Sequence, residues 1–112
     1  MELARTIVEL TTQIMASDVH LLDISALTVI ADYFVVVTGD SERQLQAIAD
    51  HTVEQLKDEH DIRPLAVEGV PASGWLLVDY GSVILHVFAP QQRAYYRLEE
   101  LWSSGRTIVR LV

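Results

Sequence analysis

One stretch decides the fold of this chain: Ala31-Asp32-Tyr33-Phe34-Val35-Val36-Val37-Thr38-Gly39-Asp40-Ser41-Glu42-Arg43. The run from Tyr33 to Val37 is nearly all apolar, which predicts a strand buried on both faces. Gly39 ends that strand, and Ser41 with Gln44 predicts the capping box of a helix. A strand, a glycine turn and a helix N-terminus form the geometry of anion sites. The stretch therefore indicates an α/β domain and poses the question of whether it is an enzyme or a binding module.

Apolar periodicity predicts the elements on both sides of this stretch. A helical stripe precedes it at Leu3, Ile7, Leu10 and Ile14, and a strand follows that stripe from Val19 to Ile24. The remaining predictions are a helix with buried Leu45, Ile48, Ala49, Thr52, Val53 and Leu56, strands at Ile62–Glu68, Trp75–Asp79 and Val83–Phe88, a helix at Gln91–Trp102 and a short apolar tail. This order predicts one α/β (α+β) domain over residues 1–112, with a mixed, mostly five-stranded sheet flanked by helices.

Composition excludes several classes of function. Sixteen acidic residues against eight basic ones give a net charge of −8, which repels DNA and RNA and steers the protein toward a basic partner. The same acidic surface also serves solubility, so the charge leaves both interpretations open. The chain has no cysteine, and therefore no disulfide, thiolate metal site or cysteine nucleophile. No apolar run reaches the roughly 18 residues of a membrane span, and no signal peptide opens the sequence, so we expect a cytoplasmic protein without membrane contact.

Motifs of catalysis and metal binding are missing from the sequence. The four histidines show no HxH or HxxxH spacing, and no Gly-x-Ser-x-Gly is present. Metal-dependent nucleotidyl transfer needs two acids two residues apart on a strand. After Ser41 the nearest candidate is Asp50, which lies on a predicted helix without a second acid, and Asp79 alone does not replace the pair. We therefore expect neither catalysis nor a cofactor, with a nucleotidyltransferase-like enzyme as the less favoured alternative.

Four blocks in fixed order make the chain similar to a known family. They are Asp32-Tyr33-Phe34 leading to Thr38-Gly39-x-Ser41-x-Arg43, then Arg63-Pro64-x-x-x-Glu68-Gly69, then Trp75-x-Leu77-x-Asp79-Tyr80-Gly81 with His86-Val87-Phe88, and Arg93-x-x-Tyr96-x-Leu98-Glu99-x-Leu101-Trp102. Together they resemble the ribosomal silencing factors, or Iojap-like proteins, from the first helix to Trp102. The resemblance implies a nucleotidyltransferase-like domain without the catalytic carboxylates.

The resemblance also implies a function and a partner. Such proteins bind the large ribosomal subunit at the ribosomal protein numbered fourteen and sterically block joining of the small subunit, repressing translation when nutrients are limited. Organellar relatives act in assembly of the large subunit, which is an alternative for this chain. A third interpretation is a module that self-pairs through an exposed strand edge, so a homodimer of the free protein is also expected.

Seven residues are candidates for contact with the partner. Trp75 and Tyr80 flank one predicted strand between Gly74 and Gly81, which predicts two aromatic anchors near one rim. Core packing is the alternative for Trp75, and a turn cap through its own backbone is the favoured alternative for Asp79. Arg43 lies in the first turn of a helix, where a cation opposes the helix dipole, so a carboxylate such as Asp32 or Glu68 is its expected partner. The full set is Trp75, Tyr80, Asp79, Glu68, Gly69, Asp32 and Arg43.

Overall fold

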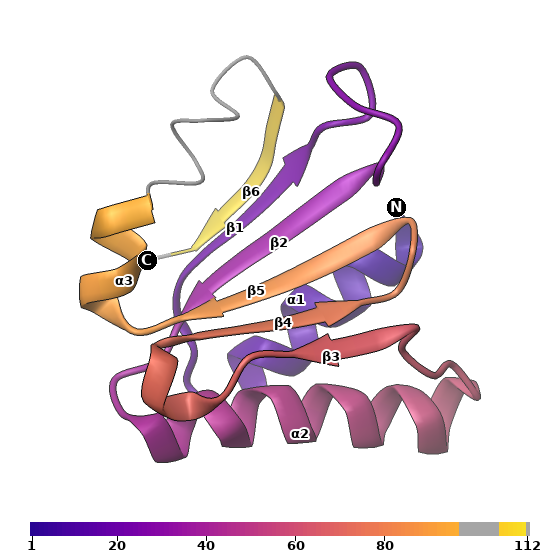
Figure 1. Ribbon diagram of the computed structural model, residues 1–112. Coiled ribbons are helices and arrows are strands. Elements are labelled where there is room, and N and C mark those ends of the chain that lie inside the picture. Colours follow the sequence, from indigo (N-terminus) through magenta and orange to yellow (C-terminus); the bar gives the residue numbers. More distant parts are fainter. Residues whose placement is uncertain (97–105, 112) are drawn as a thin grey trace.

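A mixed sheet organises the computed structural model, which describes residues 1–96 and 106–111 of the 112-residue chain. The elements are α1 (Glu2–Gln13), β1 (Ser17–Asp23), β2 (Tyr33–Thr38), α2 (Glu42–His60), β3 (Ala66–Glu68), the 3₁₀-helix η1 (Pro71–Ser73), β4 (Trp75–Asp79), β5 (Val83–Phe88), α3 (Pro90–Tyr96) and β6 (Arg106–Leu111). The strands follow the order β3-β4-β5-β2-β1-β6 across the sheet (Figure 1). The predicted fold class, a mixed sheet flanked by helices, is confirmed.

The two central strands are the most apolar in the sheet. β2 and β5 run parallel, with Tyr33 paired with Val83, while the pairings of β1 with β2 and of β4 with β5 are antiparallel. Every residue of β5 and all of β2 after Tyr33 are buried. The long connection between these parallel strands carries α2, which covers one face of the pair, and a second apolar cluster with Phe34, Ile84 and Phe88 fills the opposite face. The expectation that β2 is buried on both faces is confirmed.

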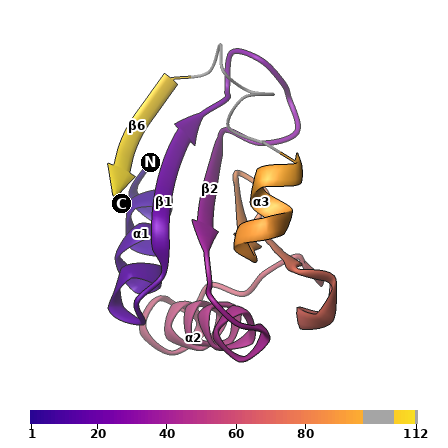
Figure 2. The ribbon, with the colours of Figure 1, turned by 90° about the vertical axis from the view of Figure 1, so that its left-hand side faces the viewer.

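Helices α1 and α2 cover one face of the sheet and form the larger core. Their apolar stripes place Ile7, Leu45 and Ile48 against strand residues such as Val35 and Leu85, and all five are fully buried. Each such side chain contributes about 1.5–3 kcal/mol when it leaves water. Helix α3 lies on the other side of the sheet from α1 (Figure 2). We call the face on the side of α1 and α2 the helix face, and the opposite one the outer face.

The predicted cap of α2 is present with a variation. Ser41 is extended, and its Oγ accepts the Gln44 backbone N–H at 3.0 Å. Gln44 Oε1 accepts the N–H of Asp40 at 2.6 Å, one residue earlier than in the usual capping box. Gln44 Nε2 also donates to the carbonyl oxygen of Met15 at 3.1 Å, which ties the start of α2 to the connection between α1 and β1.

Two predicted elements differ in the structure. The strand expected over Ile62–Glu68 is shortened to β3, because Pro64 has no N–H and the Ile62 N–H closes the end of α2 on Leu56 O at 3.0 Å. Part of the segment expected as a tail forms β6, which pairs with β1 and adds a sixth strand to the sheet. The helix expected at Gln91–Trp102 is α3 up to Tyr96, and its remainder lies outside the described residues.

Arg93 joins α3 to the sheet at the end of β2. It is 6% exposed, although arginine is rarely buried without partners. Its Nη1 donates to Thr38 Oγ1 at 2.8 Å and to the carbonyl oxygen of Asp18, and its Nη2 lies 3.5 Å from Asp18 Oδ2. Asp18 has a φ of 48° at an irregularity in the pairing of β1. The arginine therefore links three elements that are distant in sequence.

Candidate functional site

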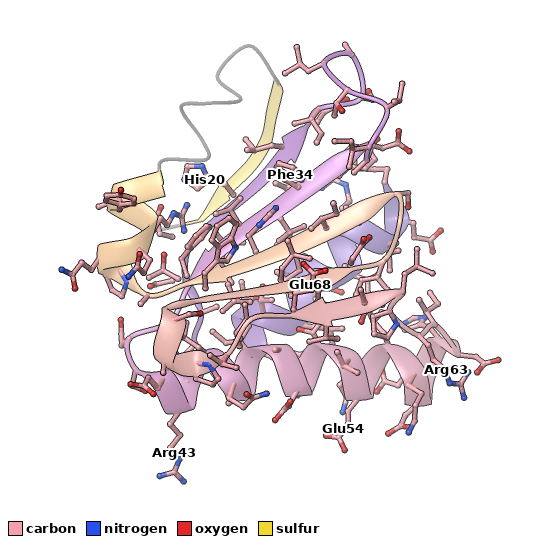
Figure 3. The ribbon with its side chains drawn as sticks, in the orientation of Figure 1. His20, Phe34, Arg43, Glu54, Arg63 and Glu68 are labelled. Atoms are coloured by element: carbon pink, nitrogen blue, oxygen red, sulfur yellow. The ribbon has the colours of Figure 1, made fainter. Side chains whose placement is uncertain are left out.

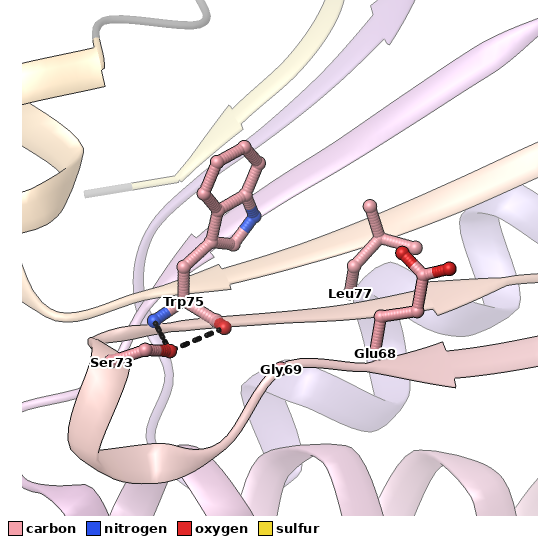
Figure 4. Close-up of a pocket in the computed structure, with 5 residues that line it drawn as sticks. All are labelled: Glu68, Gly69, Ser73, Trp75 and Leu77. Atoms are coloured by element: carbon pink, nitrogen blue, oxygen red, sulfur yellow. Dashed lines mark hydrogen bonds between the residues drawn. The ribbon is translucent and has the colours of Figure 1, made fainter.

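An open pocket of about 280 Å³ lies on the outer face where β3 and β4 meet (Figure 4). Trp75 and Leu77 come from β4 on alternate positions, so both side chains point to the same face. Glu68, which pairs with Leu77 in the register, supplies a carboxylate, and Gly69 with Ser73 completes the lining. The volume lies below the roughly 300–1,000 Å³ of sites that enclose a small ligand. The pocket therefore suits contact with single side chains of a partner.

The loop from Gly69 to Ser73 is held tightly against Trp75. Gly69 has a φ of 90°, and a Cβ at this position would lie 2.3 Å from the carbonyl oxygen of Trp75. Ser73 Oγ donates to Val70 O at 2.6 Å and accepts the N–H of Trp75 at 3.3 Å. Glycine at position 69 is thus required both by the backbone conformation and by the close approach of the two chain segments.

An aromatic cluster fixes the Trp75 side chain at the rim of the pocket. The indole Nε1 donates to His86 Nδ1 at 3.2 Å, and the ring stacks on Phe88 with centroids 4.9 Å apart and planes at 27°. Phe34 meets the His86 ring edge to face at 4.6 Å. Burial lowers the pKa of His86 to about 4, so the imidazole is neutral at pH 7. Trp75 packs against the buried cluster of Phe34 and Phe88, as the core-packing alternative predicts, and its partly exposed ring also lines the pocket.

Tyr80 does not lie beside Trp75, which corrects the expectation of two anchors at one rim. Residues an odd number of positions apart on a strand face opposite sides of the sheet. Trp75 packs with the apolar cluster of the outer face, whereas Tyr80 packs with the core of the helix face. Its hydroxyl is buried without a hydrogen-bond partner among the described residues, and burial raises the pKa of Tyr80 to about 12.

The acidic candidates occupy different regions. Asp79 Oδ1 accepts the N–H of Gly81 at 2.7 Å, which confirms the turn-capping interpretation. Asp32 is exposed just before β2, and Arg43 is exposed at the first turn of α2, beyond the other end of that strand. A six-residue strand spans about 20 Å, so the two residues do not form one surface. Arg43 points away from the body of the protein and from Glu68 (Figure 3) and, within the described part of the chain, forms no ion pair with either predicted carboxylate.

Sequence reasoning missed two residues of the pocket, Leu77 and Ser73. The alternation of β4 could have identified Leu77, because it lies two positions after Trp75 and therefore on the same face. Ser73 has no such signal, since its position depends on the short turn of η1.

The acidic side chains and histidines do not gather into a metal site in the described part of the chain. Within residues 1–96 and 106–111, no group of three histidine, aspartate or glutamate side chains could hold a metal ion. Asp50 is on α2, and Gln46 Nε2 donates to its carboxylate at 2.8 Å. No helix of the described residues is long and apolar enough to cross a membrane.

Comparison with known proteins gives consistent matches over nearly the whole chain. The family model described as "Ribosomal silencing factor during starvation" matches residues 1–111. A ribosomal silencing factor of Bacillus subtilis is 42% identical over 90 residues, which cover 80% of this chain and 75% of that protein. A mouse protein named "Mitochondrial assembly of ribosomal large subunit protein 1" is 35% identical over 87% of this chain and 43% of its own length. A crystal structure of a Chromobacterium violaceum protein aligns with a TM-score of 0.86 at 36% identity, covering 99% of this chain and 91% of that one.

Proposed function

Because this chain belongs to the family of ribosomal silencing factors, we propose that it binds the large ribosomal subunit and sterically blocks joining of the small subunit. The family match over residues 1–111 is the observation that carries this proposal. The proposed contact on the subunit is the ribosomal protein numbered fourteen, and the proposed effect is repression of translation under nutrient limitation. The protein acts as one domain in the cytoplasm, by occupying a surface and without catalysing a reaction.

The pocket of the outer face supports contact with a basic protein. It brings the Trp75 ring, the Leu77 side chain and the Glu68 carboxylate together on a chain with a net charge of −8. An aromatic face with a carboxylate beside it suits the aliphatic stem and cationic head of lysine or arginine. Aromatic anchors surrounded by polar rims carry much of the energy in protein interfaces. Among the seven candidates, Trp75, Glu68 and Gly69 are therefore the proposed contact.

A second candidate function is assembly of the large subunit. It is favoured by the name of the mouse relative, which refers to mitochondrial assembly of the ribosomal large subunit. Both functions require binding to the large subunit, and they differ in whether the mature particle is the target. A homodimer of the free protein stays a prediction, which its molar mass in solution tests.

Sedimentation with purified ribosomal subunits tests the proposed function. We expect the protein to pellet with free large subunits, and not with small subunits or joined ribosomes. Its addition before mixing of the subunits should reduce the yield of joined ribosomes. Equal recovery with both subunits would contradict the proposal. Binding to immature but not mature large subunits would favour assembly instead.

Single substitutions identify the contact surface. Trp75→Ala should weaken large-subunit binding by about thirtyfold, and Glu68→Gln by a smaller factor that disappears at raised salt. Arg43→Gln and Asp32→Asn are matched surface controls at the two ends of β2, and both should bind as the parent does. Thermal melting must accompany each assay, because Trp75 also packs in the aromatic cluster. If Trp75→Ala folds normally and binds large subunits as tightly as the parent, the contact surface lies elsewhere on the protein.

A further inference from the structure

We propose that His86 is a positioning residue, which holds the Trp75 indole in the orientation from which it contacts the partner. This inference rests on the proposed function, because the orientation of Trp75 matters for binding only if the pocket is the contact surface. His86 is 4% exposed, so it is too deep to touch a partner itself. Its effect on binding must therefore pass through the side chain that it holds.

The hydrogen bond between the two rings has a defined direction. An indole N–H only donates, so His86 Nδ1 must be unprotonated to accept it at 3.2 Å. The proton of the neutral ring is then on Nε2, which is buried and has no partner among the described residues. The lowered pKa of His86, about 4, keeps Nδ1 available as an acceptor at neutral pH. The imidazole thus accepts the indole N–H at Nδ1, while its own Nε2 makes no hydrogen bond within the described residues.

The rings on both sides make this arrangement rigid. Phe34 packs edge to face on His86, and Phe88 stacks on Trp75 at 4.9 Å. His86 and Phe88 lie on one strand, two positions apart and on the same face, and Trp75 pairs with Phe88 across the ladder. The two torsions of the indole are therefore set before a partner arrives. Loss of such preorganisation costs about two- to tenfold in affinity.

Two variants of His86 separate the hydrogen bond from the packing. His86→Phe keeps a ring against Phe34 and removes the acceptor, whereas His86→Asn shortens the side chain and keeps an oxygen near the place of Nδ1. The indole N–H of Trp75, observed by proton–nitrogen NMR and assigned with Trp75→Phe, reports the bond directly. Val87→Ala is the matched control, because Val87 is a fully buried neighbour on β5 that faces the helices.

We expect the variants to rank differently in melting temperature and in affinity for large subunits. His86→Phe should melt close to the parent, shift the Trp75 indole signal upfield and bind large subunits about two- to tenfold more weakly. His86→Asn and Val87→Ala should melt earlier, yet His86→Asn should retain the indole shift better than His86→Phe, and Val87→Ala should bind as the parent does. In a Trp75→Phe background, His86→Phe should have no further effect on binding.

Three outcomes would contradict the inference, and they can be told apart. If the parent binds large subunits and Trp75→Ala weakens binding, but His86→Phe leaves both the indole signal and the affinity unchanged, the positioning role is wrong. If the parent does not bind large subunits, the proposed function fails, and the positioning role in recognition fails with it. If affinity follows melting temperature across the three variants, His86 acts through packing alone and the inference is overturned.

Discussion

Acid should destabilise this protein through His86 well before its carboxylates are fully protonated. The pKa of this imidazole is about 4 in the folded protein, against an ordinary value of 6.5. The unfolded chain therefore binds a proton at His86 between these two pH values, while the folded protein does not. Stability is fully present above about pH 6.5 and falls as the pH is lowered toward 4. The linkage relation gives a loss of about 2 kcal/mol at pH 5 and about 3 kcal/mol at pH 4.

Urea denaturation at pH 7, 6, 5 and 4, followed by circular dichroism, measures this dependence. Carboxylates also titrate near the lower limit, so the quantity of interest is the difference between the parent and His86→Phe. Between pH 7 and pH 5, the free energy of unfolding of the variant should fall by about 2 kcal/mol less than that of the parent. Parallel curves for the two proteins would mean that His86 binds its proton equally well in the folded and the unfolded chain, which would contradict the lowered pKa. A Val87→Ala control, which removes no titratable group, should show the same pH dependence as the parent.

Three further predictions concern the backbone and the buried hydroxyl. Gly69→Ala should lower the free energy of unfolding by about 1–3 kcal/mol, since the added Cβ meets Trp75 O; an unchanged melting temperature would contradict the geometry. Ser41→Ala removes the acceptor for the Gln44 N–H, so urea denaturation should register a loss of about 1 kcal/mol, and no loss would mean that the cap is dispensable. Tyr80→Phe removes a buried hydroxyl without a hydrogen-bond partner and should leave stability equal or higher. The pKa of Tyr80 is raised to about 12, so the parent should lose stability through this group as the pH rises above 10, whereas the variant should not. The same dependence of the free energy of unfolding on alkaline pH in both proteins would contradict this prediction.

Local patterns were sufficient to predict most elements of the sheet and its helices. The apolar run of β2, the capping serine of α2 and the hairpin of β4 and β5 depend on neighbouring residues, which the sequence displays directly. β3 is shorter than the predicted strand because Pro64 has no N–H to donate and the N–H of Ile62 bonds to the end of α2. β6 depends on β1, which precedes it by more than eighty residues, and no local signal marks that pairing.

The candidate site was predictable in part. Trp75, Glu68 and Gly69 lie together around the pocket, whereas Tyr80 faces the opposite side because an odd spacing along a strand reverses direction. Counting positions along β4 would have separated the two aromatic residues. The roles of His86 and Arg93 could not be inferred in this way, because their hydrogen bonds reach residues 11 and 55 positions away in the chain.

The parallel pairing at the centre of the sheet also sets the order in which the chain is able to fold. β2 pairs with β5, which follows it by roughly fifty residues, so the middle of the sheet closes only after a long loop has been ordered. During synthesis, β2 presents an apolar edge until Val83–Phe88 has been made, and unpaired edges of this kind favour association between chains. Such non-local topology predicts refolding in milliseconds to seconds instead of microseconds, as stopped-flow fluorescence would reveal. Submillisecond refolding would show that β2 and β5 meet without this delay.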